Sequence, residues 1–351
     1  MKQTKQFTQP LNQRRGLLGG GLKGNIRHVI FEEIISLENL FLAWKEFKKG
    51  KKKKQDVQEF QFNLEDNLFQ LHQELKEKTY RHAPYTAFYI TDPKLRHIHK
   101  ACVRDRVLHH AIFRILYPIF DEQFIFDSYS CRINKGSHRA VRRLKVFCRK
   151  ASGNNSMGVV ALKCDVKKFF DSVDHSVLLQ FVRKRICNED ALWLIELVIK
   201  SFRADKGVGL PIGNVTSQLF ANIYLNELDN FAKYTLKAKY YLRYCDDFVL
   251  LNKNRTELEW AVNKITHFLG SNLKISLHPN KIIFRKYHQG IDFLGYVVRP
   301  YCINLRTKTK RRILRRVNKN NLPSYLGVLK HCNGYKIQKI VSAKLEKYNS
   351  I

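Results

Sequence analysis

The stretch RYCDDFVLL, residues 243–251, places two adjacent carboxylates between two short runs of aromatic and apolar residues. Such runs favour strands, and aspartate tolerates turn conformations, so Asp246 and Asp247 are predicted at the tip of a hairpin. Adjacent carboxylates repel each other, and a structural role rarely requires both. The pair is therefore a candidate functional group. Exposed aspartates in an ordinary turn remain the alternative at this point.

A third carboxylate, Asp165, follows the apolar run 159–162 and is predicted at the end of a buried strand. If this strand and the hairpin share one sheet, three carboxylates meet. Hard carboxylate oxygens suit Mg²⁺, which completes its shell with waters and substrate phosphates. Two such ions can activate an attacking hydroxyl and stabilise a leaving pyrophosphate. The predicted reaction class is phosphoryl transfer.

The charge of the chain indicates its partner. Among 351 residues, Lys and Arg number 64 and Asp and Glu number 30, a formal net charge of +34. A globular protein with this excess requires a polyanion, and nucleic acid is the first candidate. No apolar run approaches the length of a membrane span, so we expect a cytoplasmic protein with no membrane partner. The eight scattered cysteines form no CxxC pair and predict neither zinc nor disulfides.

Local patterns predict several helices and strands around these carboxylates. Apolar spacing predicts helices over 37–47 and from Leu64 to Leu75, then a strand, a turn at Asp92-Pro93, a basic strand and a helix from about Asp105. Two further helices are predicted to begin after Asp174 or His175 and near Thr216. The residues from Arg306 onward are basic and predicted to be helical.

At these residues the chain resembles reverse transcriptases. The tetrad YCDD, residues 244–247, resembles the family's Y-x-D-D box, and DVKKFF, residues 165–170, resembles its first metal box. The resemblance implies that Asp165 binds metal, that Val166 offers a backbone carbonyl to it, and that Phe170 is an aromatic gate against the ribose 2′-hydroxyl.

Further boxes follow in the family's order. LPIGNVTSQ, residues 210–218, resembles the loop that packs against the nascent base pair, and glycine in it allows close backbone approach. The nucleotide-binding residues that the resemblance implies are Arg132, Lys135, Phe170, Ile212, Gly213, Gln218 and Lys281. The primer- or template-binding residues that it implies are Tyr244, Phe293, Leu294, Gly295, Arg311 and Arg312, of which 293–295 belong to a segment similar to the primer grip.

The resemblance implies a fold and an activity. The expected fold is α+β, a right-hand polymerase fold with fingers and palm, made of an antiparallel sheet plus helices, and a small helical thumb. The expected parts are a flexible basic arm at 1–30, fingers with part of the palm at 31–158, the catalytic palm at 159–299 and a basic helical thumb at 300–351. The expected enzyme is an RNA-directed DNA polymerase with Asp165, Asp246 and Asp247 as catalytic residues and two Mg²⁺ ions, with Mn²⁺ as a substitute.

The variant PIG…SQ of the base-pair loop resembles reverse transcriptases of diversity-generating retroelements. This implies a mutagenic enzyme that works with an RNA template, a DNA or RNA primer, dNTPs and a small basic accessory protein. A bacterial retron or phage-defence reverse transcriptase is the closest alternative. A non-catalytic RNA-binding protein with the same fold and a two-metal nuclease are the alternatives from other classes.

Overall fold

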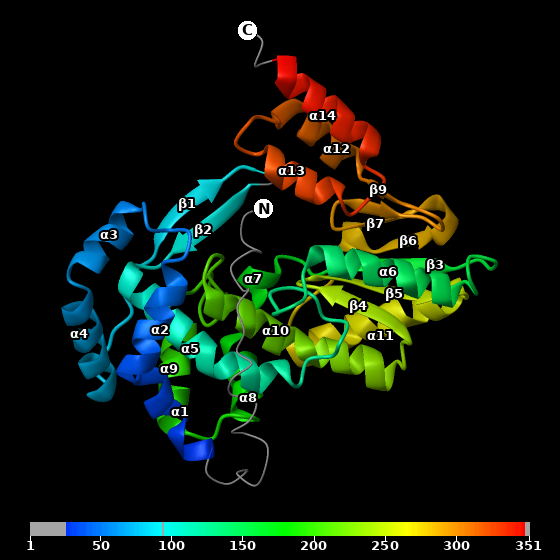
Figure 1. Ribbon diagram of the computed structural model, residues 1–351. Helices are drawn as coiled ribbons and strands as arrows, with labels where there is room; N and C mark the ends of the chain where they lie inside the picture. The colour runs from blue at the N-terminus through cyan, green and yellow to red at the C-terminus, as the bar shows by residue number, and fades with distance from the viewer. Residues whose placement is uncertain (1–25, 93–94, 348–351) are drawn as a thin grey trace. The chain divides into compact units, whose positions relative to one another are not determined.

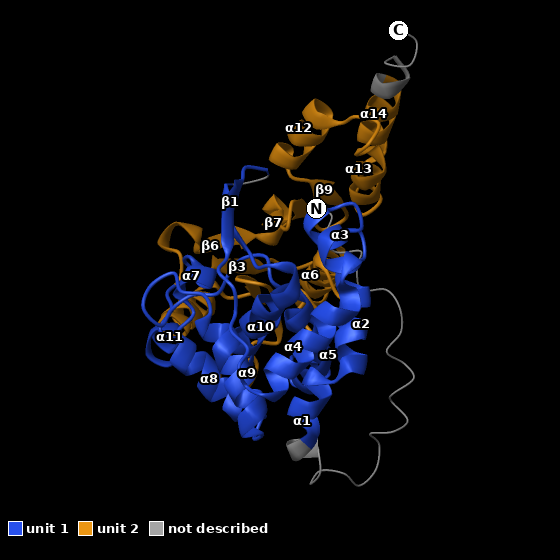
Figure 2. Cartoon of the chain, turned by 90° about the vertical axis from the view of Figure 1, so that its left-hand side faces the viewer, with its two compact units in different colours: residues 1–126, 166–230, 267–276 blue, residues 127–165, 231–266, 277–351 orange. Residues whose placement is uncertain are grey.

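The computed structural model describes residues 26–92 and 95–347 and divides into two compact units (Figure 2). Unit 1 comprises residues 1–126, 166–230 and 267–276, and unit 2 comprises residues 127–165, 231–266 and 277–351. Neither unit is a continuous stretch of sequence. The domain boundaries expected from the sequence therefore stay a prediction. Residues 1–25 of the expected arm lie outside the described residues.

Residues 26–30, expected to belong to the arm, instead begin a helix, α1 (Ile26–Ile35). The reason is local: the side chains of Ile30, Phe31, Ile34 and Ile35 are buried and recur at helical spacing. The basic and glycine-rich composition before residue 26 led to the expectation that the arm extends to residue 30, past the start of this apolar face.

Unit 1 is mainly helical. Its helices and strands, labelled in Figure 1, are α1, α2 (Leu37–Phe47), α3 (Gln55–Phe62), α4 (Leu64–Lys76), β1 (Thr86–Ile90), β2 (Arg96–Lys100), α5 (Val103–Asp121), α7 (Phe169–Ser172), α8 (His175–Arg183), α9 (Glu189–Lys200) and α10 (Val215–Asn230). Helix α5 is central, and α1, α2 and α10 pack against it. Its residues Val107, Leu108, Ala111, Ile112 and Leu116 have no exposed surface.

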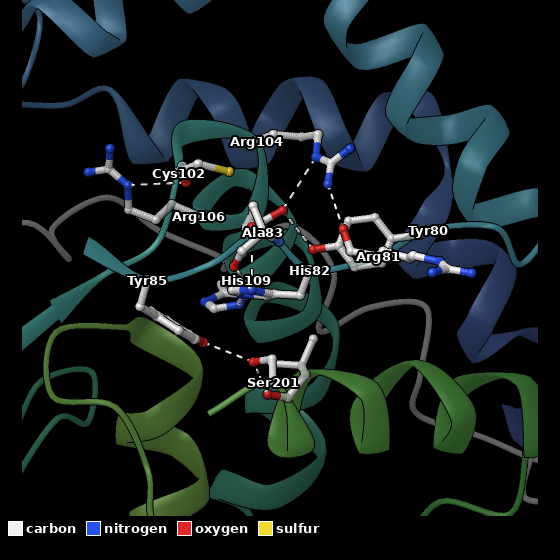
Figure 3. A network of polar contacts seen from close by, with 12 residues as sticks. Tyr80, Arg81, His82, Ala83, Tyr85, Cys102, Arg104, Arg106, His109 and Ser201 are labelled. Atoms are coloured by element: carbon white, nitrogen blue, oxygen red, sulfur yellow. Dashed lines mark hydrogen bonds and ion pairs between the residues drawn. The ribbon is translucent and has the colours of Figure 1, made fainter. Parts of the chain in front are cut away.

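A buried carboxylate joins the start of α5 to the segment before β1 (Figure 3). Asp105 is fully buried and accepts hydrogen bonds from the Tyr80 hydroxyl at 2.8 Å and the Ala83 amide at 2.9 Å. The Nε of Arg104 and the Nδ1 of His82 each lie 3.4 Å from its oxygens. A buried carboxylate with these donors holds the two segments together, because leaving it unpaired would be costly.

Unit 2 contains two antiparallel sheets. The four-stranded sheet has the order β4-β5-β3-β6, and the three-stranded sheet has the order β7-β8-β9. The strands are β3 (Val160–Asp165), β4 (Tyr240–Tyr244), β5 (Asp247–Asn252), β6 (Ile283–Lys286), β7 (Ile291–Phe293), β8 (Tyr296–Val298) and β9 (Ile303–Leu305). The apolar face of α6 (Ser137–Ala151), with Val141, Leu144 and Phe147, packs against β4, β5 and β8.

The C-terminal part of unit 2 is helical, as predicted. Helices α12 (Thr307–Arg316), α13 (Leu322–Leu329) and α14 (Tyr335–Lys347) lie beside β9 in Figure 1. They enclose a small core of their own with Ile313, Leu329 and Val341. Helix α11 (Arg255–Leu273), which the sequence patterns did not single out, begins in unit 2 and ends in unit 1. No helix among the described residues combines the length and apolar character needed to cross a membrane.

The predicted mixture of helices and antiparallel sheets is confirmed. The predicted strand end at Asp165 and the hairpin around 245–246 are confirmed as β3, β4 and β5. Helix α8 begins directly after its N-cap Asp174, and α10 begins at Val215. These predictions succeeded because each depended on local periodicity or capping.

Candidate active site

Three carboxylates lie at one end of the four-stranded sheet of unit 2. Asp165 ends β3 and is directly opposite Asp247, the first residue of β5. Asp246 occupies the two-residue turn between β4 and β5. Directly opposed residues of an antiparallel pair project from the same face of the sheet. The sheet register therefore brings together residues that are about eighty positions apart in sequence.

Burial and mutual repulsion make this group of carboxylates electrostatically unfavourable. The pKa of Asp246 is raised, first by burial and then by the negative charges of Asp165 and Asp247. The pKa of Asp247 is also raised by burial, while the ammonium group of Lys163 acts in the opposite direction. Clusters of this kind are typical of functional sites, because structural cores rarely concentrate like charges.

Two lysines partly neutralise the carboxylates. Lys281 Nζ donates to Asp165 Oδ1 at 2.6 Å, and Lys163 Nζ lies 3.5 Å from Asp247 Oδ1. The amide of His278 also donates to the Asp165 carbonyl at 2.8 Å, which holds the turn carrying Lys281 beside the end of β3. Lys281 was predicted near a triphosphate, and the structure places it against a predicted metal ligand.

Lys163 was not predicted as a site residue. Its signal in the sequence is its position two residues before Asp165 on the same strand, because residues i and i+2 share a face of a sheet. A single lysine is not distinctive in a strongly basic chain, so the alternation alone did not predict Lys163 as a site residue.

The carboxylate oxygens suit a hard divalent cation. The repulsion that raises the pKa of Asp246 is of the kind that such a cation would relieve. Among the residues that the structure describes, no three His, Cys, Asp or Glu side chains form a ready-made metal site. A cation would compete with Lys281 and Lys163 for the same oxygens. The carboxylate donors therefore fit the expected ion, although they are not arranged in its coordination geometry.

Val166, an expected carbonyl ligand, is a buried residue of unit 1.

The loop that carries Arg132 and Lys135 runs beside β4 in unit 2. The Tyr129 amide donates to the Arg243 carbonyl at 2.9 Å, which fixes the loop at the strand. Arg132 Nη1 donates to the Ser128 carbonyl at 3.2 Å, and Lys135 Nζ lies 5.1 Å from the centre of the Tyr129 ring. Both cationic side chains are thus held close to their own loop.

Three of the predicted nucleotide-binding residues come together in unit 1. The amide of Leu210 donates to the Phe170 carbonyl at 2.6 Å, and the amide of His99 in β2 donates to the Ile212 carbonyl at 3.2 Å. Gly213 has φ of +129°, a conformation that a side chain would strain. Gln218 lies in the first turn of α10 and is partly buried.

The predicted primer and template residues belong to unit 2. Tyr244 and Leu294 both pack against the apolar core that contains the fully buried Phe293. Gly295 has φ of +88°, and its carbonyl accepts from the Arg306 amide at 3.0 Å just before α12. Arg311 and Arg312 are consecutive residues of α12, and Arg311 is exposed.

Comparisons with known proteins identify the family of this chain. A family model described as reverse transcriptase (RNA-dependent DNA polymerase) matches residues 91–298. Protein YkfC of Escherichia coli (strain K12) is 28% identical over 270 residues, which are 64% of this chain and 69% of that protein. The group II intron-encoded protein LtrA of Lactococcus lactis subsp. cremoris is 24% identical over 324 residues, covering 71% of this chain and 53% of that protein.

The chain thus spans about half the length of the intron-encoded relative. A solved structure of apo telomerase from Candida Tropicalis, truncated from the C-terminal domain, shares 12% identity with a TM-score of 0.48, covering 67% of this chain and 59% of that one. The family match extends over more than half of the chain and includes Asp165, Asp246 and Asp247. The chain belongs to the reverse transcriptase family of RNA-dependent DNA polymerases.

Proposed function

We propose that this chain copies an RNA template into cDNA and is the mutagenic polymerase of a diversity-generating retroelement. The observation that carries the polymerase proposal is the meeting of Asp165, Asp246 and Asp247 at one end of a sheet in a chain of net charge +34. A protein that only bound RNA would gain nothing from three carboxylates there, because they repel phosphates.

Reverse transcriptases generally use divalent metal ions, usually Mg²⁺, and we propose two ions here, with Mn²⁺ as a substitute. Asp165, Asp246 and Asp247 would hold them, and the bound ions would lower the charge barrier between an attacking hydroxyl and a triphosphate. Lys281 and Lys163 supply positive charge to the same face of the sheet, which favours the approach of polyphosphate.

The remaining residues position the substrates. Arg132 and Lys135 offer cationic groups to a triphosphate, with the planar guanidinium suited to two phosphate oxygens. Ile212 presents an apolar side chain to the base pair, where a polar amide is more usual in related enzymes, and this loosens selection of the base. Tyr244, Phe293, Leu294 and Gly295 support the primer, and Arg311 and Arg312 contact the duplex backbone.

The retroelement assignment is supported by the PIG…SQ form of the base-pair loop, and it includes a small basic accessory protein as partner. A second candidate is a role connected with group II introns, which the likeness to LtrA favours. A retron or phage-defence enzyme would use the same chemistry with another product. A non-catalytic RNA-binding protein is the alternative from another class.

Primer extension tests these proposals. The purified chain is given Mg²⁺, dNTPs and matched RNA and DNA templates, and the products are sequenced. Asp246→Asn removes one carboxylate charge at the site. Asp66→Asn removes the same charge from the exposed face of α4 and is the matched control.

Extension on RNA that is lost in Asp246→Asn and kept in Asp66→Asn supports the polymerase. Errors concentrated opposite template adenines support the retroelement assignment, whereas accurate extension favours the intron, retron or defence roles. Failure on every template, including the native RNA with its accessory partner, supports the RNA-binding alternative instead.

A further inference from the structure

Arg243 is a buried arginine three residues before Asp246. It lies in β4 and has no exposed surface, whereas the other Lys and Arg side chains whose burial the structure describes are at least partly exposed. Burying a guanidinium group is unfavourable unless its N–H groups find acceptors. The position of those acceptors therefore indicates what the residue holds in place.

One acceptor belongs to the catalytic turn. Arg243 Nη1 donates to the Cys245 carbonyl at 3.1 Å. Cys245 has φ of +55°, a left-handed conformation that is unfavourable for a residue other than glycine. Its carbonyl belongs to the peptide group that joins it to Asp246. A hydrogen bond to this carbonyl fixes the plane of that peptide group, and hence the direction in which the Asp246 side chain leaves the backbone.

A second acceptor belongs to the loop before α6. Arg243 Nη2 donates to Ser128 Oγ at 3.2 Å, and the Arg243 amide donates to the Asp127 carbonyl at 3.0 Å. Asp127 is anchored in turn to α6, since Arg143 Nε donates to its Oδ1 at 2.7 Å. The guanidinium thus connects the catalytic turn to a segment that is fixed to a helix.

The same segment carries a predicted substrate residue. The carbonyl of Ser128 accepts from Arg132 Nη1, while its hydroxyl accepts from Arg243. One residue therefore receives hydrogen bonds from both arginines. A shift of Arg243 would disturb the turn that carries Asp246 and the loop that carries Arg132 together.

We propose that Arg243 is a positioning residue of the active site, which holds the Cys245–Asp246 peptide in its unfavourable conformation and couples this turn to the Arg132 loop. This inference rests on the proposed polymerase function. Arg243 has no exposed surface and acts through Cys245 and Ser128. Its loss should change metal binding and dNTP use, which a residue that only filled the core would leave unchanged.

The test compares four variants with the wild type. Arg243→Gln removes the charge and the forked donor, Arg243→Lys keeps the charge with different geometry, and Ser128→Ala removes one anchor with little change in volume. Leu242→Ala is the matched control, because Leu242 is a fully buried neighbour in β4 whose loss destabilises the core without touching the polar contacts.

Two readouts separate positioning from stability. Mn²⁺ binding is measured by electron paramagnetic resonance on the protein without substrate, and kcat and KM for dNTP are measured with Mg²⁺, each beside the melting temperature. We expect Arg243→Gln to weaken Mn²⁺ binding by about 10-fold and to lower kcat/KM by about 100-fold, as small misplacements in active sites do. Arg243→Lys and Ser128→Ala should show smaller changes in the same direction.

The proposal is overturned if Arg243→Gln and Leu242→Ala change Mn²⁺ binding alike at equal loss of melting temperature, or if neither changes it. If Arg243→Gln does not fold, Ser128→Ala decides: Mn²⁺ binding and kcat/KM equal to wild type would refute the coupling. If the wild type binds Mn²⁺ but extends no primer on any template, including the native RNA with its accessory partner, the polymerase proposal fails. Weaker Mn²⁺ binding in the variants would then still support the positioning role. A wild type that binds no Mn²⁺ would refute both the metal site and the role of Arg243.

Discussion

Replacing Asp105 by asparagine is expected to lower the free energy of unfolding of unit 1 by about 3 kcal/mol. The carboxylate is fully buried and accepts from the Tyr80 hydroxyl and the Ala83 amide on its two oxygens. Asparagine keeps only one acceptor oxygen, so one donor then faces an amide NH₂ group. Losing one hydrogen bond to a charged group costs roughly 1.5–3 kcal/mol, and making the other neutral costs about 1 kcal/mol.

Tyr80→Phe is the matched comparison. It removes the hydroxyl donor but leaves the carboxylate with the Ala83 amide and with Arg104 and His82 nearby. One hydrogen bond to the charged carboxylate is lost but no buried donor is left unpaired, so the expected cost lies at the low end of that range, about 1.5 kcal/mol. We expect Asp105→Asn to lower the free energy of unfolding substantially more than Tyr80→Phe does, because it removes the charge of the acceptor and not only one contact.

Urea unfolding followed by tryptophan fluorescence measures this effect. Trp44 and Trp193 lie in unit 1, while Trp260 lies in unit 2 and is exposed. A Trp260→Phe background therefore makes the fluorescence a report on unit 1. A loss of 3 kcal/mol lowers the denaturation midpoint by roughly 1–2 M urea. A loss below about 1 kcal/mol, or equal losses in both variants, would refute the reasoning.

Three further outcomes are expected. Burial alone would raise the pKa of Asp174, but hydrogen bonds from Lys274, Ser176 and the Val177 amide lower it to about 2. The ionised Asp174 side chain therefore stabilises the fold above its unfolded pKa of 3.8, and this stabilisation is lost as the pH falls toward 2. Urea unfolding from pH 6 to 2.5 should show the free energy of unfolding of wild type approaching that of Asp174→Asn. A difference that stays constant with pH would contradict this. Lys163→Gln removes the charge that lowers the pKa of Asp247, so carbon NMR titration of metal-free protein should show this carboxyl protonating at higher pH than in wild type, and an unchanged titration would exclude Lys163 as its partner. Arg311→Ala and Arg312→Ala should each reduce the slope of log RNA affinity against log salt by about 1, whereas an unchanged slope would remove α12 from the RNA-binding surface.

Local sequence patterns were sufficient for the elements that carry the carboxylates. The apolar run before Asp165 and the strand formers around residues 245–246 predicted β3, β4 and β5, because alternation and turn preference act within a few residues. The family boxes then predicted which of these residues belong to one site. Glycine at position 213 was predicted to allow close backbone approach; the structure shows in addition a φ of +129°, which a side chain would strain.

The sequence by itself thus determined the chemical types at the site, the strand ends that carry them and the cationic character of the chain. Only the tertiary structure decided which polar groups meet: Lys281 with Asp165, Lys163 with Asp247, and Asp105 with the Tyr80 hydroxyl and the Ala83 amide. It also showed that Arg243 is buried and donates to the carbonyl of Cys245, in the turn that carries Asp246. These pairings depend on sheet register and helix packing between distant segments, whereas sequence periodicity reports only which face of an element is apolar.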